Sequence, residues 1–310
     1  MNDKLFIYHH DDCLQHDPGP NHPENAGRLR SIMKALRESP LQNQLQFVEA
    51  PLGTKDQVVL AHDAGLWDEV NSVAPRQGRY SLDPDTHLSP GSLNAALRGV
   101  GGACAGIDAL MKKETQHAFC LTRPPGHHAT PDHSMGFCIF NHVAIAALHA
   151  MQAHGLQRVA VMDFDVHHGN GTQDICVGRQ GLLYVSTHQF PHYPGTGSLR
   201  ENRAGNIHNV PLHDGMADDE YQDLFSEQVL PQLEEFQPEL LLVSAGFDAH
   251  ANDPLASIRL TESTYRWLGV ELRKVANSHC DGRLLSVLEG GYNLDVLGSS
   301  VLAYCSGSVG

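Results

Sequence analysis

The stretch RVAVMDFDVHHGNG (158–171) decides the fold, because an apolar run passes directly into a polar, glycine-containing segment. An apolar run without a polar face is typical of a strand that is buried on both sides, as in a parallel sheet. In open α/β sheets, ligands bind beyond the carboxyl ends of the strands. The stretch therefore predicts a buried parallel strand that presents Asp163, Asp165 and His167 at a binding edge.

Apolar runs elsewhere predict the other strands of this sheet, at 4–9, 117–122, 182–188, 239–248 and 283–291. Helix-like stretches alternate with them, at 23–38, 92–112, 140–153, 219–236 and 261–278. The third of these has apolar spacing near 3.6 and is followed by Gly155, which predicts a helix C-cap. The alternation favours a parallel sheet with helices on both faces. Because no repeat or linker interrupts it, residues 1–310 are expected to form a single domain.

Composition narrows the class of protein. The formal net charge of −15 repels phosphate backbones, so nucleic acid is not an expected direct ligand. No run approaches 18 apolar residues, and the N-terminal segment lacks the apolar core of a signal peptide. Seven scattered cysteines without a C-x-x-C motif indicate reduced thiols, as in a cytoplasmic protein, and the lack of a long apolar run argues against a membrane partner.

Polar segments follow four of the predicted strands directly: RPPGHHA (123–129), DFDVHHGNG (163–171), AGFDAH (245–250) and EGGY (289–292). Any one of them alone could be an ordinary glycine-rich turn. All four carry metal-compatible or acid–base side chains, and the carboxyl ends of parallel strands converge on one rim. We therefore expect a single functional site there.

Asp165 and His167 lie two residues apart, so on an extended chain both side chains point to the same side. Asp248, at the end of another strand, can supply a third ligand. Two carboxylates and an imidazole suit Zn²⁺, although Fe²⁺, Co²⁺ and Mn²⁺ accept the same donors. Asp163 can ligate too, or it can orient its neighbours.

Acid–base groups accompany these candidate ligands. His127 and His128 are adjacent in a loop segment, and imidazole serves both as base and as acid near neutral pH. Tyr292 follows Gly290 and Gly291, whose backbone freedom permits close approach to a ligand. A phenol placed there can donate a hydrogen bond to a developing oxyanion.

Taken together, RPPGHHA, GFCIFN (136–141), DFDVHHGNG, SAGFDAH (244–250) and LEGGY (288–292) resemble the motifs of the histone deacetylase and acetylpolyamine amidohydrolase superfamily. The resemblance covers residues from about 20 to 300, with RPPGHHA and DVHHGNG most similar to the class II branch. NHPENAGR (21–28) and DPDTHLSPGS (83–92) also resemble segments of bacterial members. The resemblance implies a three-layer α/β arginase/deacetylase fold with a mainly parallel eight-stranded sheet.

The same resemblance assigns roles to the site residues. It implies one Zn²⁺ per chain on the three ligands named above, and a zinc-dependent deacylase that hydrolyses amides. His128 would act as general base and acid, with His127 as its electrostatic partner. Asp163 would pair with His127, and Asn170 would stand beside the second histidine. Tyr292 would bind the carbonyl oxygen as it becomes an oxyanion.

A structural K⁺ is a further family feature implied by the resemblance. Backbone carbonyls and side chains of five residues would hold it here: Asp163, Asp165, His167, Ser186 and Thr187.

The resemblance places the substrate channel between Phe137 and Tyr193, where the family usually has two phenylalanines. Gly136 would accept a hydrogen bond from the substrate amide through its carbonyl. Asp85 resembles a rim aspartate that binds peptide backbone, and Gly290 lies beside the reacting carbonyl. The expected partner is an acylated lysine peptide or a small acylated amine.

Three rival readings remain. A ureohydrolase of the arginase type needs two metals, but Gly169 and His250 occupy the positions of its extra carboxylates. Polyamine-selective class II members carry a glutamate seven residues after the third ligand, where this chain has Leu255, which favours acyl-lysine. A non-catalytic binding module is disfavoured by the complete set of ligands, histidines and Tyr292. The oligomeric state is left open.

Overall fold

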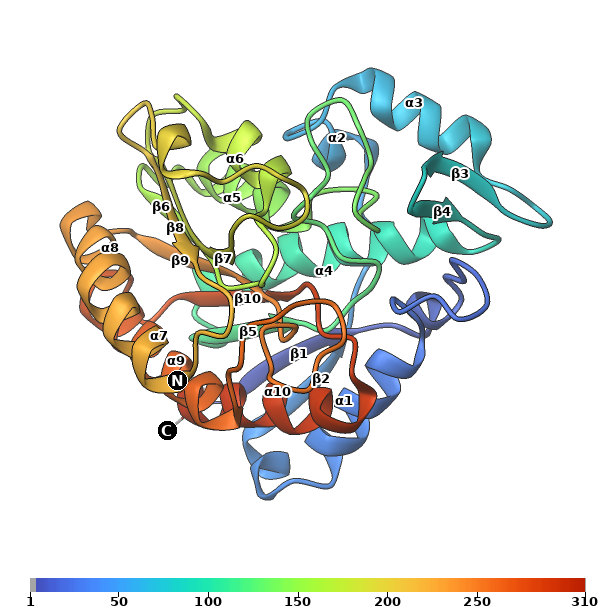
Figure 1. The fold of residues 1–310 in the computed structure, drawn as a ribbon. Helices are drawn as coiled ribbons and strands as arrows, with labels where there is room; N and C mark the ends of the chain where they lie inside the picture. The colour runs from blue at the N-terminus through green and yellow to red at the C-terminus, as the bar shows by residue number, and fades with distance from the viewer. Residues whose placement is uncertain (1–3, 310) are drawn as a thin grey trace.

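An eight-stranded sheet forms the centre of the computed structural model, which describes residues 4–309 (Figure 1). The strand order is β2-β1-β5-β10-β9-β6-β7-β8, and every neighbouring pair is parallel. The strands are β1 (Leu5–His9), β2 (Leu45–Glu49), β5 (His117–Cys120), β6 (Val159–Asp163), β7 (Leu182–Gln189), β8 (Ile207–Leu212), β9 (Leu240–Ala245) and β10 (Leu284–Leu288). The predicted α/β class and eight-stranded sheet are confirmed, and the sheet is parallel throughout.

The apolar part of residues 158–171 forms β6 in the interior of this sheet, between β9 and β7. All five residues of β6 are buried, as expected for a strand without a polar face. Successive side chains pack on opposite sides: Met162 belongs to the core on one face and Val161 to the core on the other.

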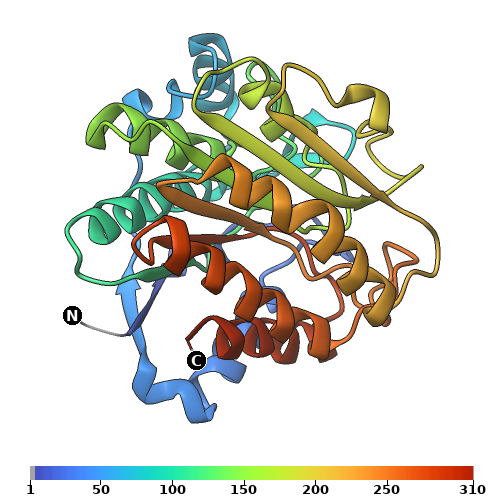
Figure 2. The same cartoon turned by 90° about the vertical axis from the view of Figure 1, so that its left-hand side faces the viewer.

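Helices cover both faces of the sheet, which makes three layers (Figure 2). The helices α4 and α5 pack on one face through small and aliphatic residues, whereas α1, α9 and α10 pack on the other. The helices are α1 (Gly27–Arg37), α2 (Lys55–Val58), α3 (Ala64–Val73), α4 (Ser92–Met111), α5 (His142–His154), α6 (Asn170–Cys176), α7 (Asp218–Leu224), α8 (Leu230–Phe236), α9 (Glu262–His279) and α10 (Leu294–Val309).

Helix boundaries follow local chemistry. The helix α5 begins where the Asn141 side chain accepts a hydrogen bond from the Ala144 N–H, and it ends at Gly155 in the left-handed conformation (φ 71°). The predicted C-cap is therefore confirmed. The predicted helix at 219–236 is α7 and α8, which are joined by a π-helical turn at Phe225–Val229. The 3₁₀ turns are Asp11–Leu14, Pro40–Gln44 and Leu199–Glu201.

Several elements were not predicted from the sequence. The edge strands β2 and β8 are partly exposed and contain polar residues, so they lack the continuous apolar run of a central strand. The antiparallel hairpin of β3 (Tyr80–Asp83) and β4 (Thr86–Leu88) lies outside the main sheet. The helix α10 is apolar and rich in small residues, which hides its periodicity.

All seven cysteines are buried and unpaired, as expected for reduced thiols. Within residues 4–309, no helix combines the length and apolar character needed to cross a membrane.

Candidate active site

The four polar segments singled out in the sequence come together because their strands are neighbours. The strands β5, β10, β9 and β6 stand side by side in the sheet, although they are far apart in the chain. Each segment leaves the carboxyl end of its strand, so the side chains meet at one edge of the sheet.

Asp165, His167 and Asp248 form a buried cluster whose ligand atoms all lie within 4.8 Å of one another. The His167 Nδ1 atom is 3.1 Å from Asp165 Oδ1 and 3.1 Å from Asp248 Oδ2. Burial lowers the pKa of His167, but the hydrogen bonds and charges of the two carboxylates outweigh it and raise the pKa to about 10. The cluster thus stabilises positive charge at its centre.

Glycine lets the backbone approach these carboxylates. The Gly290 N–H donates to Asp165 Oδ2 at 2.7 Å. A Cβ atom at position 290 would lie 2.0 Å from Asp248 Oδ2, and one at Gly246 would lie 2.1 Å from Asp165 Oδ2. Two buried carboxylates repel each other unless a cation offsets their charge. The donor set, one imidazole and two carboxylates, fits Zn²⁺.

The two adjacent histidines have different partners. The His127 Nδ1 atom is 3.0 Å from Asp163 Oδ2, and the His128 Nδ1 atom is 2.9 Å from the amide oxygen of Asn170. Because an amide oxygen only accepts, His128 Nδ1 carries the proton and Nε2 keeps its lone pair. Both rings are buried, and their centroids are 4.0 Å apart.

These partners move the two pKa values in opposite directions. Burial lowers the pKa of His127, but the charges of Asp163, Asp165 and Glu289 raise it to about 10. Burial, together with the positive charges of His127 and His167, holds the pKa of His128 well below its usual value. One imidazolium and one neutral imidazole therefore stand side by side.

Tyr292 completes the group from the β10 side. Its backbone N–H donates to Asp253 Oδ2 at 2.7 Å, and the Arg28 guanidinium lies over its ring at 5.0 Å. Burial raises the pKa of Tyr292 well above 10, helped by Asp248, so the hydroxyl keeps its proton. It is therefore available as a hydrogen-bond donor.

A cavity of about 220 Å³ opens onto His128, His167 and Tyr292. Most of its wall is apolar or aromatic, and the ring of Phe137 packs edge-on to Tyr292. Phe137 has a positive φ of 68°, a strained conformation that is held by Thr86 Oγ1 accepting from its N–H. The lining residues are Asp85, His128, Gly136, Phe137, His167, His192, Tyr193, Leu255 and Tyr292.

The predicted rim residues lie around this cavity. Asp85, in the turn of the β3–β4 hairpin, accepts the Gly136 N–H at 3.0 Å. The Leu255 carbonyl accepts from His192 Nε2 at 2.9 Å. Tyr193, 38% exposed, stands at the mouth and packs edge-on to His128.

The residues predicted to hold potassium lie on β6, β7 and the segment after β6. In the sheet, Ser186 is the register partner of Asp163. The Ser186 hydroxyl bonds His188 Nδ1 at 2.8 Å, and the Thr187 hydroxyl bonds the Tyr221 hydroxyl at 2.9 Å. Potassium binding there stays a prediction.

Four further residues contact the site without having been predicted. The His192 ring stacks on His167 with 5.2 Å between centroids, and Asp253 accepts the N–H groups of Tyr292 and Asn293. Arg28 donates to the Gly291 carbonyl, and Glu289 Oε2 accepts the N–H groups of Gly126 and His127. Arg28 and Glu289 lie inside quoted motifs, so their burial could have been suspected, whereas His192 gives no sequence signal.

Comparisons with known proteins identify the family and the fold. The family model described as histone deacetylase domain matches residues 22–307. A histone deacetylase-like amidohydrolase of Pseudomonas aeruginosa is 38% identical over 303 residues, which cover 91% of this chain and 80% of that protein. A probable deacetylase of Archaeoglobus fulgidus is 36% identical, and the match covers 93% of this chain and 81% of that protein. A solved structure, the HDA15 HD domain, matches this chain with a TM-score of 0.93 and 32% sequence identity. The match covers 99% of this chain and 88% of the chain in that structure.

Proposed function

The chain belongs to the histone deacetylase family, and from that premise we propose that it is a zinc-dependent deacylase acting on N-acyl-lysine in proteins or peptides. The family membership supports deacetylase or amidohydrolase activity. One observation carries the finer proposal: His167 of the buried Asp–His–Asp cluster, the neutral His128 and the protonated Tyr292 line one cavity, and the charged His127 lies directly behind His128.

Asp165, His167 and Asp248 would hold the zinc. When bound, the metal supplies Lewis acidity toward the acyl carbonyl and lowers the pKa of water toward about 7. The K⁺ expected from the family resemblance is proposed for the Asp163–Ser186 region, where metal analysis of the purified protein would detect it.

The protein's own groups divide the proton transfers. His128 is neutral with its Nε2 lone pair free, so it accepts a proton from the attacking water and later gives it to the leaving amine. His127, held by Asp163, stays charged and adds positive potential beside the developing oxyanion. The Tyr292 hydroxyl donates to that oxyanion.

The cavity supports a linear acyl-amine substrate. Phe137 and Tyr193 border it with aromatic surface that suits a methylene chain, and Leu255 presents no charge at the mouth. A distant ammonium of an acylpolyamine would need an acidic partner where Leu255 stands, so acyl-lysine is the proposed substrate. The buried, unpaired thiols support a reducing compartment, and we propose the cytoplasm.

The test is a comparison of kcat/KM for acetyl-lysine peptides, longer acyl-lysine peptides and acetylpolyamines on the zinc-loaded enzyme. We expect kcat/KM for acetyl-lysine peptides to exceed kcat/KM for acetylpolyamines. The Leu255→Glu variant should lower the ratio of these two values by about tenfold, which corresponds to roughly 1.4 kcal/mol. Leu255→Gln is the matched uncharged control, and it should leave the ratio unchanged.

A higher kcat/KM for acetylpolyamine in the unsubstituted enzyme would replace the lysine assignment with the polyamine one. No hydrolysis of any substrate, with zinc bound, would instead indicate a binding module.

A further inference from the structure

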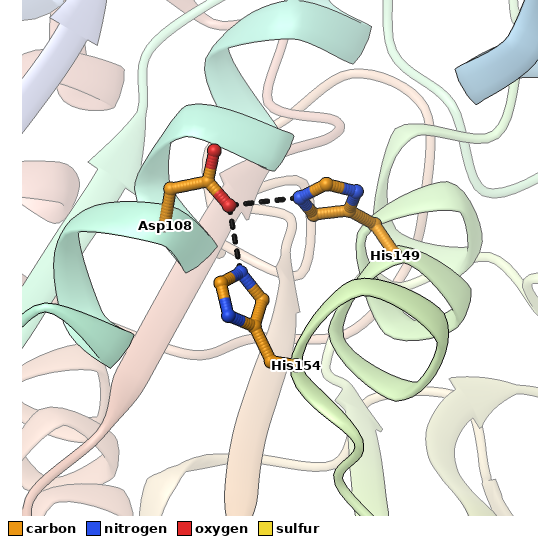
Figure 3. A group of neighbouring side chains, drawn as sticks. All are labelled: Asp108, His149 and His154. Atoms are coloured by element: carbon orange, nitrogen blue, oxygen red, sulfur yellow. Dashed lines mark hydrogen bonds and ion pairs between the residues drawn. The ribbon is translucent and has the colours of Figure 1, made fainter.

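A second group of side chains with metal-compatible donor atoms lies between α4 and α5 (Figure 3). Asp108 comes from α4, and His149 and His154 come from α5. The Asp108 Oδ1 atom lies 2.9 Å from His149 Nε2 and 2.7 Å from His154 Nε2. Both imidazole rings thus converge on one carboxylate oxygen.

This group is remote from the active site. The helix α4 ends at Met111, before β5 begins at His117, and α5 ends at His154, before β6 begins at Val159. Asp108, His149 and His154 therefore lie near the amino ends of the strands, whereas the active site lies at their carboxyl ends. The two sites therefore lie at opposite ends of the strands and share no residue.

The two helices have to pack together to build the group. His149 and His154 are five residues apart, which places them about 140° apart around an ideal helix. They meet only because Asp108 reaches between them from α4. His154 is in the last turn of α5, where the helix dipole favours positive charge. A net charge of −15 further favours cation capture.

Two imidazole nitrogens and one carboxylate oxygen are a donor set for Zn²⁺, Cu²⁺ and related ions. With metal–ligand bonds of about 2.0–2.1 Å, tetrahedral ligands lie roughly 3.3 Å apart. The observed separations of 2.7 and 2.9 Å are hydrogen-bond distances, so a metal needs each pair to open by about half an ångström.

The exposed fractions make that adjustment and metal entry possible. The side chains of Asp108, His149 and His154 are 40%, 15% and 22% exposed. The carboxylate can rotate toward solvent while the two rings remain partly held by the helices, and a water molecule can complete the coordination.

We propose that Asp108, His149 and His154 bind a divalent transition metal and so link α4 to α5. Zn²⁺ and Cu²⁺ are the ions that this donor set fits best. A bound ion stabilises the folded protein by mass action, and it leaves the chemistry of the active site, at the carboxyl ends of the strands, unchanged.

The test counts metals on the intact zinc-loaded protein after excess Zn²⁺ and gel filtration. Wild type is expected to retain one more Zn²⁺ per chain than the His149→Ala/His154→Ala variant, whose affinity at this site should fall by more than about 100-fold. His279→Ala, which removes a histidine from the last turn of α9, is the matched control and should bind as wild type does. Equal zinc content in wild type and the double variant would overturn the proposal.

Electron paramagnetic resonance with Cu²⁺ provides an independent readout. The remote site offers two imidazole nitrogens, whereas the active-site cluster offers one. A signal from copper bound to two nitrogens should appear in wild type and disappear in the double variant. The deacylase activity of the double variant should equal that of wild type. A two-nitrogen signal that persists in the double variant would place the copper elsewhere and contradict the assignment.

Discussion

Small differences in hydrogen-bond partner give adjacent residues different chemistry. His127 and His128 are both buried, yet one faces a carboxylate and the other an amide. The sequence indicated both histidines and Tyr292 because they occur in glycine-rich segments after apolar runs. It could not indicate His192, because stacking on His167 depends on how the turn after β7 folds back.

Tyr292→Phe tests the role of a single hydroxyl. Loss of one oxyanion donor should reduce kcat by roughly 10²–10³-fold, and zinc content should stay the same because the hydroxyl is not a ligand. Steady-state kinetics and metal analysis measure both. Tyr265→Phe is the control, since the Tyr265 hydroxyl is buried without a hydrogen-bond partner among the described residues. Wild-type turnover in Tyr292→Phe would remove this residue from the mechanism.

The segment between β7 and β8 shows how one element presents a substrate-contacting residue. It carries His192 and Tyr193, and Glu201 closes it by accepting the N–H groups of Gly197 and Ser198, each at 3.0 Å. Burial alone would raise the pKa of Glu201, but these hydrogen bonds outweigh it and lower the pKa to about 2. Its contribution to stability is complete above the ordinary value of 4.5 and is lost as pH falls toward 2.

Glu201→Ala should therefore loosen the cavity wall. We expect a loss of about 1–3 kcal/mol in the free energy of unfolding and an increase in KM that exceeds any fall in kcat. Urea unfolding and substrate titration measure the two effects. Glu201→Gln keeps a neutral hydrogen-bond acceptor, so it should recover part of the lost stability and part of the change in KM. An unchanged KM in Glu201→Ala would show that other contacts position Tyr193.

Central elements were predictable where edge elements were not. The apolar runs of β5, β6, β7, β9 and β10 follow from burial on both faces, and Gly155 ends α5 as its position predicts. The strands β2 and β8 have one neighbour each, so their sequences are mixed and give no comparable signal. The hairpin that carries Asp85 is short and its first strand is largely exposed, so it gives no apolar run; the family resemblance pointed to Asp85 but not to the hairpin.

A buried ion network joins distant parts of the whole molecule. Glu24 accepts hydrogen bonds from Arg28 and Arg123, and all three side chains are fully buried. Arg28 in turn donates to the carbonyls of Glu289 and Gly291 beside Tyr292. Sequence reasoning could not supply this network, because one of its hydrogen bonds joins residues that are 263 positions apart.

Glu24→Gln should destabilise the whole fold, because it leaves two buried guanidinium groups without their carboxylate. The expected loss in the free energy of unfolding is about 3–5 kcal/mol. Denaturant unfolding measures it, with the exposed Glu38→Gln as the control, expected within about 0.5 kcal/mol of wild type. A loss below about 1 kcal/mol would show that the two guanidinium groups do not depend on the Glu24 carboxylate.

The position of β10 has a consequence for synthesis on the ribosome. This strand lies between β5 and β9, so in the described sheet it joins the three-strand group β2-β1-β5 to the four-strand group β9-β6-β7-β8. Until residues 284–288 emerge, the nascent chain exposes two unpaired edges that can recruit each other or another chain. The interval between translation of β9 and of β10 is therefore the period in which these two edges are open to pairing.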